Sequence, residues 1–151
     1  MKPLAILLTA ISLLAGCGDE EATPPERPAG DGPLVSFART GGFAPQPYSL
    51  EVDREGGATL TLTTRQDKDK TKRFTLSADD RSTLTDALDA VRDAGEDGRN
   101  VNAGCADCFY YSVKADGIDL ELDSFTYTDD ATPEAQVALV AILEELVGRE
   151  S

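Results

Sequence analysis

Two periods of apolar residues organise the chain after residue 33. Short segments in which apolar and polar residues alternate predict half-buried strands, and two stretches with apolar residues three and four positions apart predict amphipathic helices. The expected strands cover 34–39, 48–52, 58–64, 73–76, 108–113 and 118–125. The expected helices cover 77–94 and the segment from Pro133 onward, with Leu139, Ile142, Leu143 and Leu146 as the apolar stripe of the second.

Polar residues at the ends of the two helical stretches support their boundaries. Ser77 is a cap residue with the acids of 79–80 in the first turn, where the helix dipole favours negative charge, and Gly95 ends the helix. Thr132 is expected to cap the last helix, with Pro133 at its first position.

The turns complete the expected topology. Segment 115–117 (Ala-Asp-Gly) joins two alternating runs, which is a strong hairpin signal, and segment 55–57 (Glu-Gly-Gly) is a second turn. Segment 96–104 is expected to be a loop. The order β-β-β-(β)-α-β-β-α predicts an α+β fold, an antiparallel sheet of about five to six strands with both helices on one face.

The amino terminus predicts export and lipidation. Lys2 precedes an apolar run at 4–15, which is shorter than a membrane span, and the segment Leu-Ala-Gly-Cys at 14–17 resembles the lipobox of bacterial lipoproteins. The resemblance implies cleavage of signal peptide 1–16, a diacylglyceryl thioether on Cys17 and often a third acyl chain, which together hold a protein firmly on a membrane. The alternative is an ordinary secretory signal followed by a chance cysteine.

Segment 17–33 is expected to be a tether. It holds four prolines and several acids but no apolar run, a composition that cannot order itself by burial. Residues 18–33, at about 3.1 Å each if extended, reach up to roughly 50 Å. We therefore expect one domain, 34–151, held on the outer face of a bacterial membrane.

Composition narrows the classes of function. The net charge of −14 argues against a nucleic-acid partner and against a surface lying on anionic lipid. The chain has no histidine, which removes Ser-His-Asp and Cys-His catalysis and histidine-ligated metals. We expect a non-enzymatic, monomeric protein without a cofactor or a bound metal.

The cysteines at 105 and 108 form a C-x-x-C motif that has three readings: a redox pair, half of a zinc site or a disulfide. Zinc normally takes four ligands, and a thioredoxin-like pair stands at a helix start, whereas a strand is expected after Cys108. Export removes the reducing cytosol, and lipidation of Cys17 leaves one pair. We predict a Cys105–Cys108 disulfide.

Two charged features have ordinary structural readings. The paired acids at 79–80 and 129–130 lie at or before helix starts, so capping and solubility account for them better than catalysis or calcium binding. The stretch 65–73 concentrates five of the fourteen Lys and Arg residues. It is interpreted as a solvated hairpin tip that discourages edge pairing, with a docking patch for an acidic partner as the alternative.

Segment 40–45 (Thr-Gly-Gly-Phe-Ala-Pro) is expected to be a loop. It lacks the lysine and serine of a phosphate-binding loop, and no helix follows it. Phe43 either packs into the core at a turn or extends from a flexible loop as an aromatic contact for a partner, and the residues alone do not choose between these.

Several short motifs in this order resemble emfourin, a family of small bacterial inhibitors of thermolysin-like metallopeptidases of the protealysin type. The similarity covers about 35–147. The matching residues are Phe37, Arg39, Gly41, Gly42 and Phe43 near the start, Asp107, Phe109, Tyr111 and Val113 in one strand, and Pro133 before the leucine-rich last helix.

The resemblance implies an inhibitor that inserts a loop into the protease cleft. Gly41 and Gly42 would allow close backbone approach, Phe43 would fill a subsite, and Asp107 would approach the protease zinc, with Arg39 in the same group. The competing hypothesis is a non-catalytic envelope lipoprotein that binds another protein or a ligand.

Overall fold

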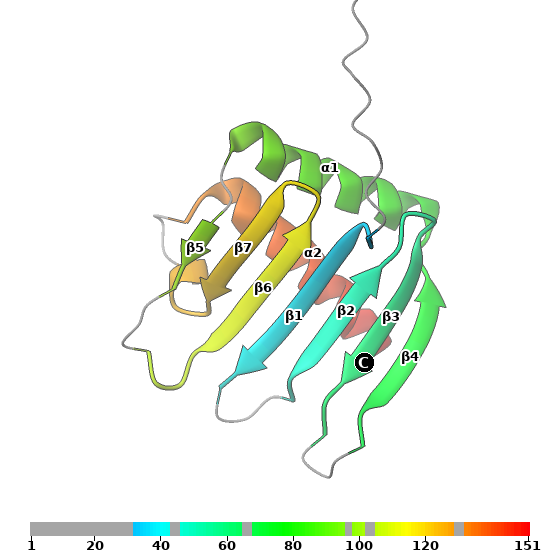
Figure 1. Ribbon diagram of the computed structural model, residues 1–151, viewed down its shortest axis with the longest axis horizontal. Helices are drawn as coiled ribbons and strands as arrows, with labels where there is room; N and C mark the ends of the chain where they lie inside the picture. The colour runs from blue at the N-terminus through cyan, green and yellow to red at the C-terminus, as the bar shows by residue number, and fades with distance from the viewer. Residues whose placement is uncertain (1–31, 43–45, 65–67, 96–97, 102–104, 129–131) are drawn as a thin grey trace, which may run out of the picture.

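The computed structural model describes residues 32–42, 46–64, 68–95, 98–101, 105–128 and 132–151, and these form an α+β fold (Figure 1). This confirms the predicted class, although the described residues form seven strands instead of five to six. The strands are β1 (Val35–Gly41), β2 (Tyr48–Val52), β3 (Gly57–Leu62), β4 (Lys70–Thr75), β5 (Gly98–Asn100), β6 (Phe109–Ala115) and β7 (Ile118–Asp123). The helices are α1 (Ala78–Ala94), α2 (Glu134–Glu150) and the 3-10 turn η1 (Thr126–Thr128).

The strands form one sheet in the order β4-β3-β2-β1-β6-β7-β5. Every neighbouring pair is antiparallel except β5 and β7, which run parallel. Strand β1 lies at the centre and pairs with β6 over its whole length, from Val35 opposite Ala115 to Gly41 opposite Phe109. Every residue of β1, including the last one, Gly41, is therefore held by a neighbouring strand on at least one side.

Several predicted bounds differ from those of the structure. Segment 96–104 was expected to be a loop, yet Gly98–Asn100 forms β5 beside β7. Strand β5 is formed by backbone pairing of three residues, which show no alternation of apolar and polar residues. The hydrophobic pattern of the sequence therefore did not predict this strand. Strand β1 continues past residue 39 because Thr40 and Gly41 stay paired with β6.

Strand β4 is an edge strand and begins three residues before the predicted position. Lys70, Thr71 and Lys72 are exposed but pair with β3 through their backbones. Lys72 also forms an ion pair with Glu150 of α2 at 2.9 Å. Charged side chains along this edge fit the solvated reading of stretch 65–73, of which residues 65–67 lie outside the described part.

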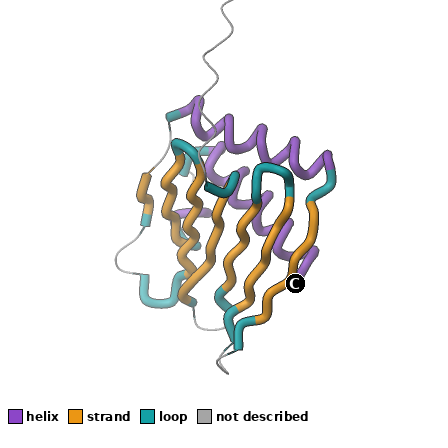
Figure 2. The backbone as a smooth tube through the Cα atoms, turned by 45° about the vertical axis from the view of Figure 1, so that its right-hand side comes forward, coloured by secondary structure: helices purple, strands orange, loops and turns teal. Residues whose placement is uncertain are grey.

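Both helices cover the same face of the sheet, as the two views show (Figure 1, Figure 2). The core lies between the two layers and is made mostly of aliphatic side chains, together with the rings of Phe37, Tyr48 and Tyr111. The largest fully buried side chains are those of Phe37, Leu50, Leu60, Leu84, Leu88, Leu120, Leu122, Leu139 and Leu143. The opposite face of the sheet, here called the open face, has no described element over it (Figure 2).

Helix α1 begins and ends as its sequence predicts. The Ser77 hydroxyl accepts the Asp80 backbone N–H at 3.0 Å, and Gly95 follows the helix with a φ of 63°. Helix α2 begins one residue later than expected, with Pro133 in the cap position. The hydroxyl of the buried Thr132 donates to the Thr126 carbonyl, so this residue ties the helix start to η1 instead of capping the helix.

The predicted signal peptide, Cys17 and nearly all of the tether lie outside the described residues and stay predictions. Among the described helices, none combines the length and the hydrophobicity that a membrane crossing requires.

The connections between strands differ at the two ends of the sheet. Strand direction places the tight turns 53–56 and 116–117 at one end, here called the turn end, where β1 also begins (Figure 1). The other end, here called the loop end, is where β1, β3, β5 and β7 finish and where β2, β4 and β6 begin, so the described residues of the longer connections adjoin the sheet there. Gly41, Gly42 and Asp107, which the emfourin resemblance singles out, lie at the loop end, whereas Phe37 lies in the middle of β1.

Candidate functional site

Gly41 and Gly42 close the end of β1 against the start of β6. Their φ angles of 77° and 73° lie in the left-handed region, which glycine adopts without a steric cost. A Cβ atom on Gly41 would lie 2.8 Å from the Cys108 carbonyl oxygen and 2.9 Å from the Tyr110 ring, and one on Gly42 would overlap the Phe109 ring. Only glycine therefore fits at both positions.

The predicted Cys105–Cys108 disulfide is confirmed, with the two Cα atoms 5.6 Å apart. Cys108 is buried, and the Tyr110 hydroxyl donates to the Cys105 carbonyl at 3.1 Å. Asp107 lies between the two cysteines and is exposed. The disulfide thus closes a short loop beside Gly41 and presents one carboxylate to solvent.

Arg39 lies within β1 and not in a loop. It follows Val35 and Phe37 at a period of two, so its side chain lies on the face that the helices cover, where it is 19% exposed. Its Nη1 atom donates to Oε2 of Glu144 on α2 at 3.3 Å. Phe43 lies outside the described residues, so both readings of its role stay open.

Glu144 links α2 to two strands of the sheet. Besides pairing with Arg39, it accepts a hydrogen bond from the Tyr48 hydroxyl. Burial raises the pKa of Glu144 above its ordinary value of 4.5, and the Arg39 charge opposes that rise. The Arg39 guanidinium carbon also lies 4.4 Å from the centre of the Tyr48 ring and 5.2 Å from that of Phe109, within the range of cation–π contacts.

Reasoning from the sequence missed Tyr48 and Glu144 as neighbours of the candidate loop. The period of two along β1 was a usable signal, because it places Arg39 on the same face as Phe37 and so requires a buried counter-charge. The identity of that counter-charge was not readable, since Glu144 follows Arg39 by 105 residues.

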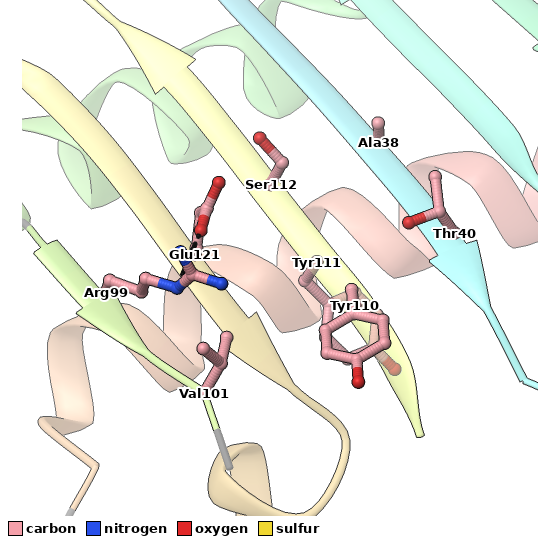
Figure 3. Close-up of a pocket in the computed structure, with 8 residues that line it drawn as sticks. All are labelled: Ala38, Thr40, Arg99, Val101, Tyr110, Tyr111, Ser112 and Glu121. Atoms are coloured by element: carbon pink, nitrogen blue, oxygen red, sulfur yellow. Dashed lines mark ion pairs between the residues drawn. The ribbon is translucent and has the colours of Figure 1, made fainter. Parts of the chain in front are cut away.

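A hollow of about 210 Å³ lies on the open face beside the loop end (Figure 3). The small residues Ala38 and Ser112, from neighbouring strands, leave this space, and the Tyr110 ring borders it. On the other side Arg99 of β5 forms an ion pair with Glu121 of β7 at 3.2 Å (Figure 3). The hollow is lined by hydroxyl groups and by one cationic and one anionic side chain, whose charges cancel. This lining suits a ligand group that is polar and uncharged.

The paired acids at 79–80 lie in the first turn of α1. Asp80 accepts hydrogen bonds from Ser77 and from Arg149, the latter at 2.7 Å. These bonds, that from Arg149 first, lower the pKa of Asp80 below its ordinary value of 3.8. The acids at 129–130 lie outside the described residues. Within the described ranges, no three His, Cys, Asp or Glu side chains come together as a metal site.

The structure brings Gly41, Gly42 and the loop of Asp107 together at the loop end, with Arg39 behind them on the helical side. Compared with protein-family models and with curated proteins, the sequence has no match. The similarity to emfourin therefore depends on the residues of this chain alone.

Proposed function

We propose that this protein is a lipid-anchored extracytoplasmic inhibitor of thermolysin-like metallopeptidases, and that its loop end enters the protease cleft. The observation that carries the proposal is the junction of Gly41 and Gly42 with the disulfide-closed loop of Asp107. These are the positions named by the resemblance, and two segments far apart in the sequence present them together.

The geometry favours binding with a small loss of entropy. Strand β1 is paired throughout its length, and the disulfide fixes the neighbouring loop before any partner arrives. A surface that is ordered in advance retains more of its contact energy as affinity. The space that a side chain would take at Gly41 and Gly42 is filled by Cys108, Tyr110 and Phe109, so these contacts hold the backbone in place. The exposed Asp107 carboxylate is available to the protease zinc.

The direction of β1 suits an anchored inhibitor. The strand begins at Val35, next to the predicted tether, and ends at Gly41. At about 3.3 Å per residue these ends lie roughly 20 Å apart. A lipid on Cys17 would attach the domain through its turn end, so the anchor would leave the loop end free to meet soluble proteases.

Inhibition of peptide cleavage tests the proposal. The full chain, purified in detergent, is mixed with a thermolysin-like protease, and hydrolysis of a fluorogenic peptide is followed. We expect slowing at micromolar protein. Replacing Asp107 by Asn should weaken inhibition at least about tenfold, because an interaction of a charged group is lost.

The matched control is Asp116→Asn, which changes an exposed aspartate in the tight turn at the opposite end. It should inhibit as the wild type does. No slowing by the wild-type chain at micromolar concentration would refute inhibition of that protease, and equal loss in both variants would remove the loop end as the contact.

The second candidate is a non-catalytic envelope lipoprotein that binds another protein or a ligand, and the hollow beside Ser112 favours it. Pull-downs from envelope and culture supernatant separate the two. A metallopeptidase that is captured by the wild type but not by Asp107→Asn supports inhibition. A partner that Asp107→Asn retains and Ser112→Leu loses supports the alternative, because leucine would fill the hollow.

A further inference from the structure

Four elements meet around the Arg39 side chain. Arg39 belongs to β1, the rings beside it belong to Tyr48 of β2 and Phe109 of β6, and its counter-ion is Glu144 of α2. The Glu144 carboxylate uses both oxygens, one for Arg39 and one for the Tyr48 hydroxyl. The guanidinium is thus fixed by a charge on one side and by two aromatic rings.

The Phe109 ring connects this cluster to the candidate loop. It lies within 5.2 Å of the Arg39 guanidinium and also occupies the space where a side chain on Gly42 would be. The backbone of Phe109 is held by Ser124, the residue after β7, because its carbonyl accepts the Ser124 N–H at 2.8 Å and its N–H donates to the Ser124 hydroxyl at 3.2 Å. A line of direct contacts therefore runs from Glu144 to Gly42.

Two consecutive glycines keep a single backbone conformation only if neighbouring residues restrict them. Glycine adopts positive and negative φ about equally well, so the φ of 73° at Gly42 is allowed by the residue but not selected by it. The Phe109 ring fills the space on one side of Gly42, so the Gly42 backbone cannot move to that side while the ring stays in place. Whatever fixes that ring therefore restricts the conformation at the end of β1.

We propose that Arg39 and Glu144 are positioning residues that fix the conformation of Gly41 and Gly42 through Phe109. The effect of this positioning on inhibition rests on the proposed function. Arg39, which the resemblance places among the residues that meet a protease, acts from behind the loop because its side chain faces α2.

The chemistry of the pair explains why both members matter. A half-buried guanidinium without its carboxylate loses its charge partner, and its lowest-energy position moves toward water and away from the Phe109 ring. Lysine in its place would keep the charge but not the flat group that lies against two rings. Either change should free the glycine pair while the hydrophobic core stays intact.

The test uses the full chain in detergent with the substitutions Arg39→Lys and Glu144→Gln. The control is Glu150→Gln, which removes another ion pair between α2 and the sheet, that with Lys72 of β4. Two quantities are measured below the unfolding temperature: the backbone order parameters of Gly41 and Gly42 by NMR, and the inhibition constant against a thermolysin-like protease.

We expect the Gly42 order parameter to fall from a rigid value of about 0.85 to below about 0.6 in Arg39→Lys and Glu144→Gln, and to stay unchanged in Glu150→Gln. Inhibition should weaken about tenfold in the same two variants. Unchanged order at both glycines would overturn the positioning role. If the wild type does not inhibit, the proposed function fails, and the order parameters still decide whether Arg39 and Glu144 position the glycines.

Discussion

The turn end and the loop end of the sheet are held by different kinds of contact. At the turn end, Asp53 accepts backbone N–H groups of Glu55 at 2.9 Å and Gly57 at 2.7 Å, so the turn is closed by residues within a few positions of each other. At the loop end, the contacts of Gly42 with Phe109 and of Arg39 with Glu144 join residues far apart in the sequence.

This difference explains why one end is suited to recognition. A turn closed by its own side chain has one conformation and little surface to vary. Connections held by the sheet, a helix and a disulfide can change their exposed residues while the support stays the same, which is how binding loops are built on rigid scaffolds. The experiments below measure how firmly each end is fixed, from the largest expected effect to the smallest.

Adding a methyl group to one glycine at each end gives the largest expected difference. Gly42→Ala places a Cβ in the Phe109 ring at a positive φ and should lower the free energy of unfolding by about 3 kcal/mol. Gly56→Ala also has a positive φ, but its Cβ would meet only the flexible Arg81 side chain, so about 1 kcal/mol is expected. Urea unfolding measures both.

The stability losses of Gly42→Ala and Gly56→Ala show whether the loop end is held more firmly than the turn end. If Gly42→Ala costs no more than Gly56→Ala, the Phe109 ring moves aside freely and the loop end is not held by long-range contacts. A larger loss at Gly42 with an unchanged m-value would show that the native state itself is strained at that position.

The same contrast governs what could be predicted from the sequence. The Ser77 cap, the Gly95 end of α1 and the Asp116-Gly117 hairpin were all predicted correctly, because each is a local signal that acts within a few residues. Segment 98–100 was missed because its three residues form β5 only through a ladder with β7.

The sequence offers Gly41, Gly42 and Asp107 as candidates, whereas the contacts that hold them could not be predicted from it. Gly41, Gly42 and Asp107 were named, and their two segments lie together at the loop end. The side of β1 that Arg39 occupies follows from its period of two with Phe37. The roles of Tyr48 and Glu144 depend on how α2 crosses the sheet, which no local pattern specifies.

Removing the disulfide should have the second largest effect. Replacing Cys105 and Cys108 by Ser opens a loop that the chain-entropy description values at about 2 kcal/mol. The loss should concentrate at the loop end, with faster amide exchange at Tyr110 and unchanged exchange in β3, because the Tyr110 hydroxyl bonds to the Cys105 carbonyl. Urea unfolding measures the loss of stability, and hydrogen exchange measures where in the chain it occurs. Equal acceleration in β3 would mean that the bond supports the whole fold.

The smallest expected effect distinguishes the ends by the sign of their pH dependence. Glu144, near the loop end, has a pKa raised by burial above its ordinary 4.5, so the stability it contributes is complete below pH 4.5 and is lost as the pH rises through its folded-state pKa. Asp80, at the start of α1, has a pKa lowered by its bonds from Arg149 and Ser77, so its contribution is present above pH 3.8 and is lost on acidification.

Urea unfolding between pH 2 and pH 8 of the wild type, Glu144→Gln and Asp80→Asn tests both signs. Relative to the wild type, Glu144→Gln should gain stability as the pH rises from 4.5 toward neutrality, because only the wild type must ionise a half-buried carboxyl group. Asp80→Asn should be less stable than the wild type at neutral pH and equal to it near pH 2, where the Asp80 carboxyl is protonated. Parallel curves for Glu144→Gln and the wild type would mean that the Arg39 charge fully offsets the cost of burying the Glu144 carboxylate. The ion pair between α2 and Arg39 would then support the loop end equally at acidic and neutral pH, and the two ends would not differ in the sign of their pH dependence.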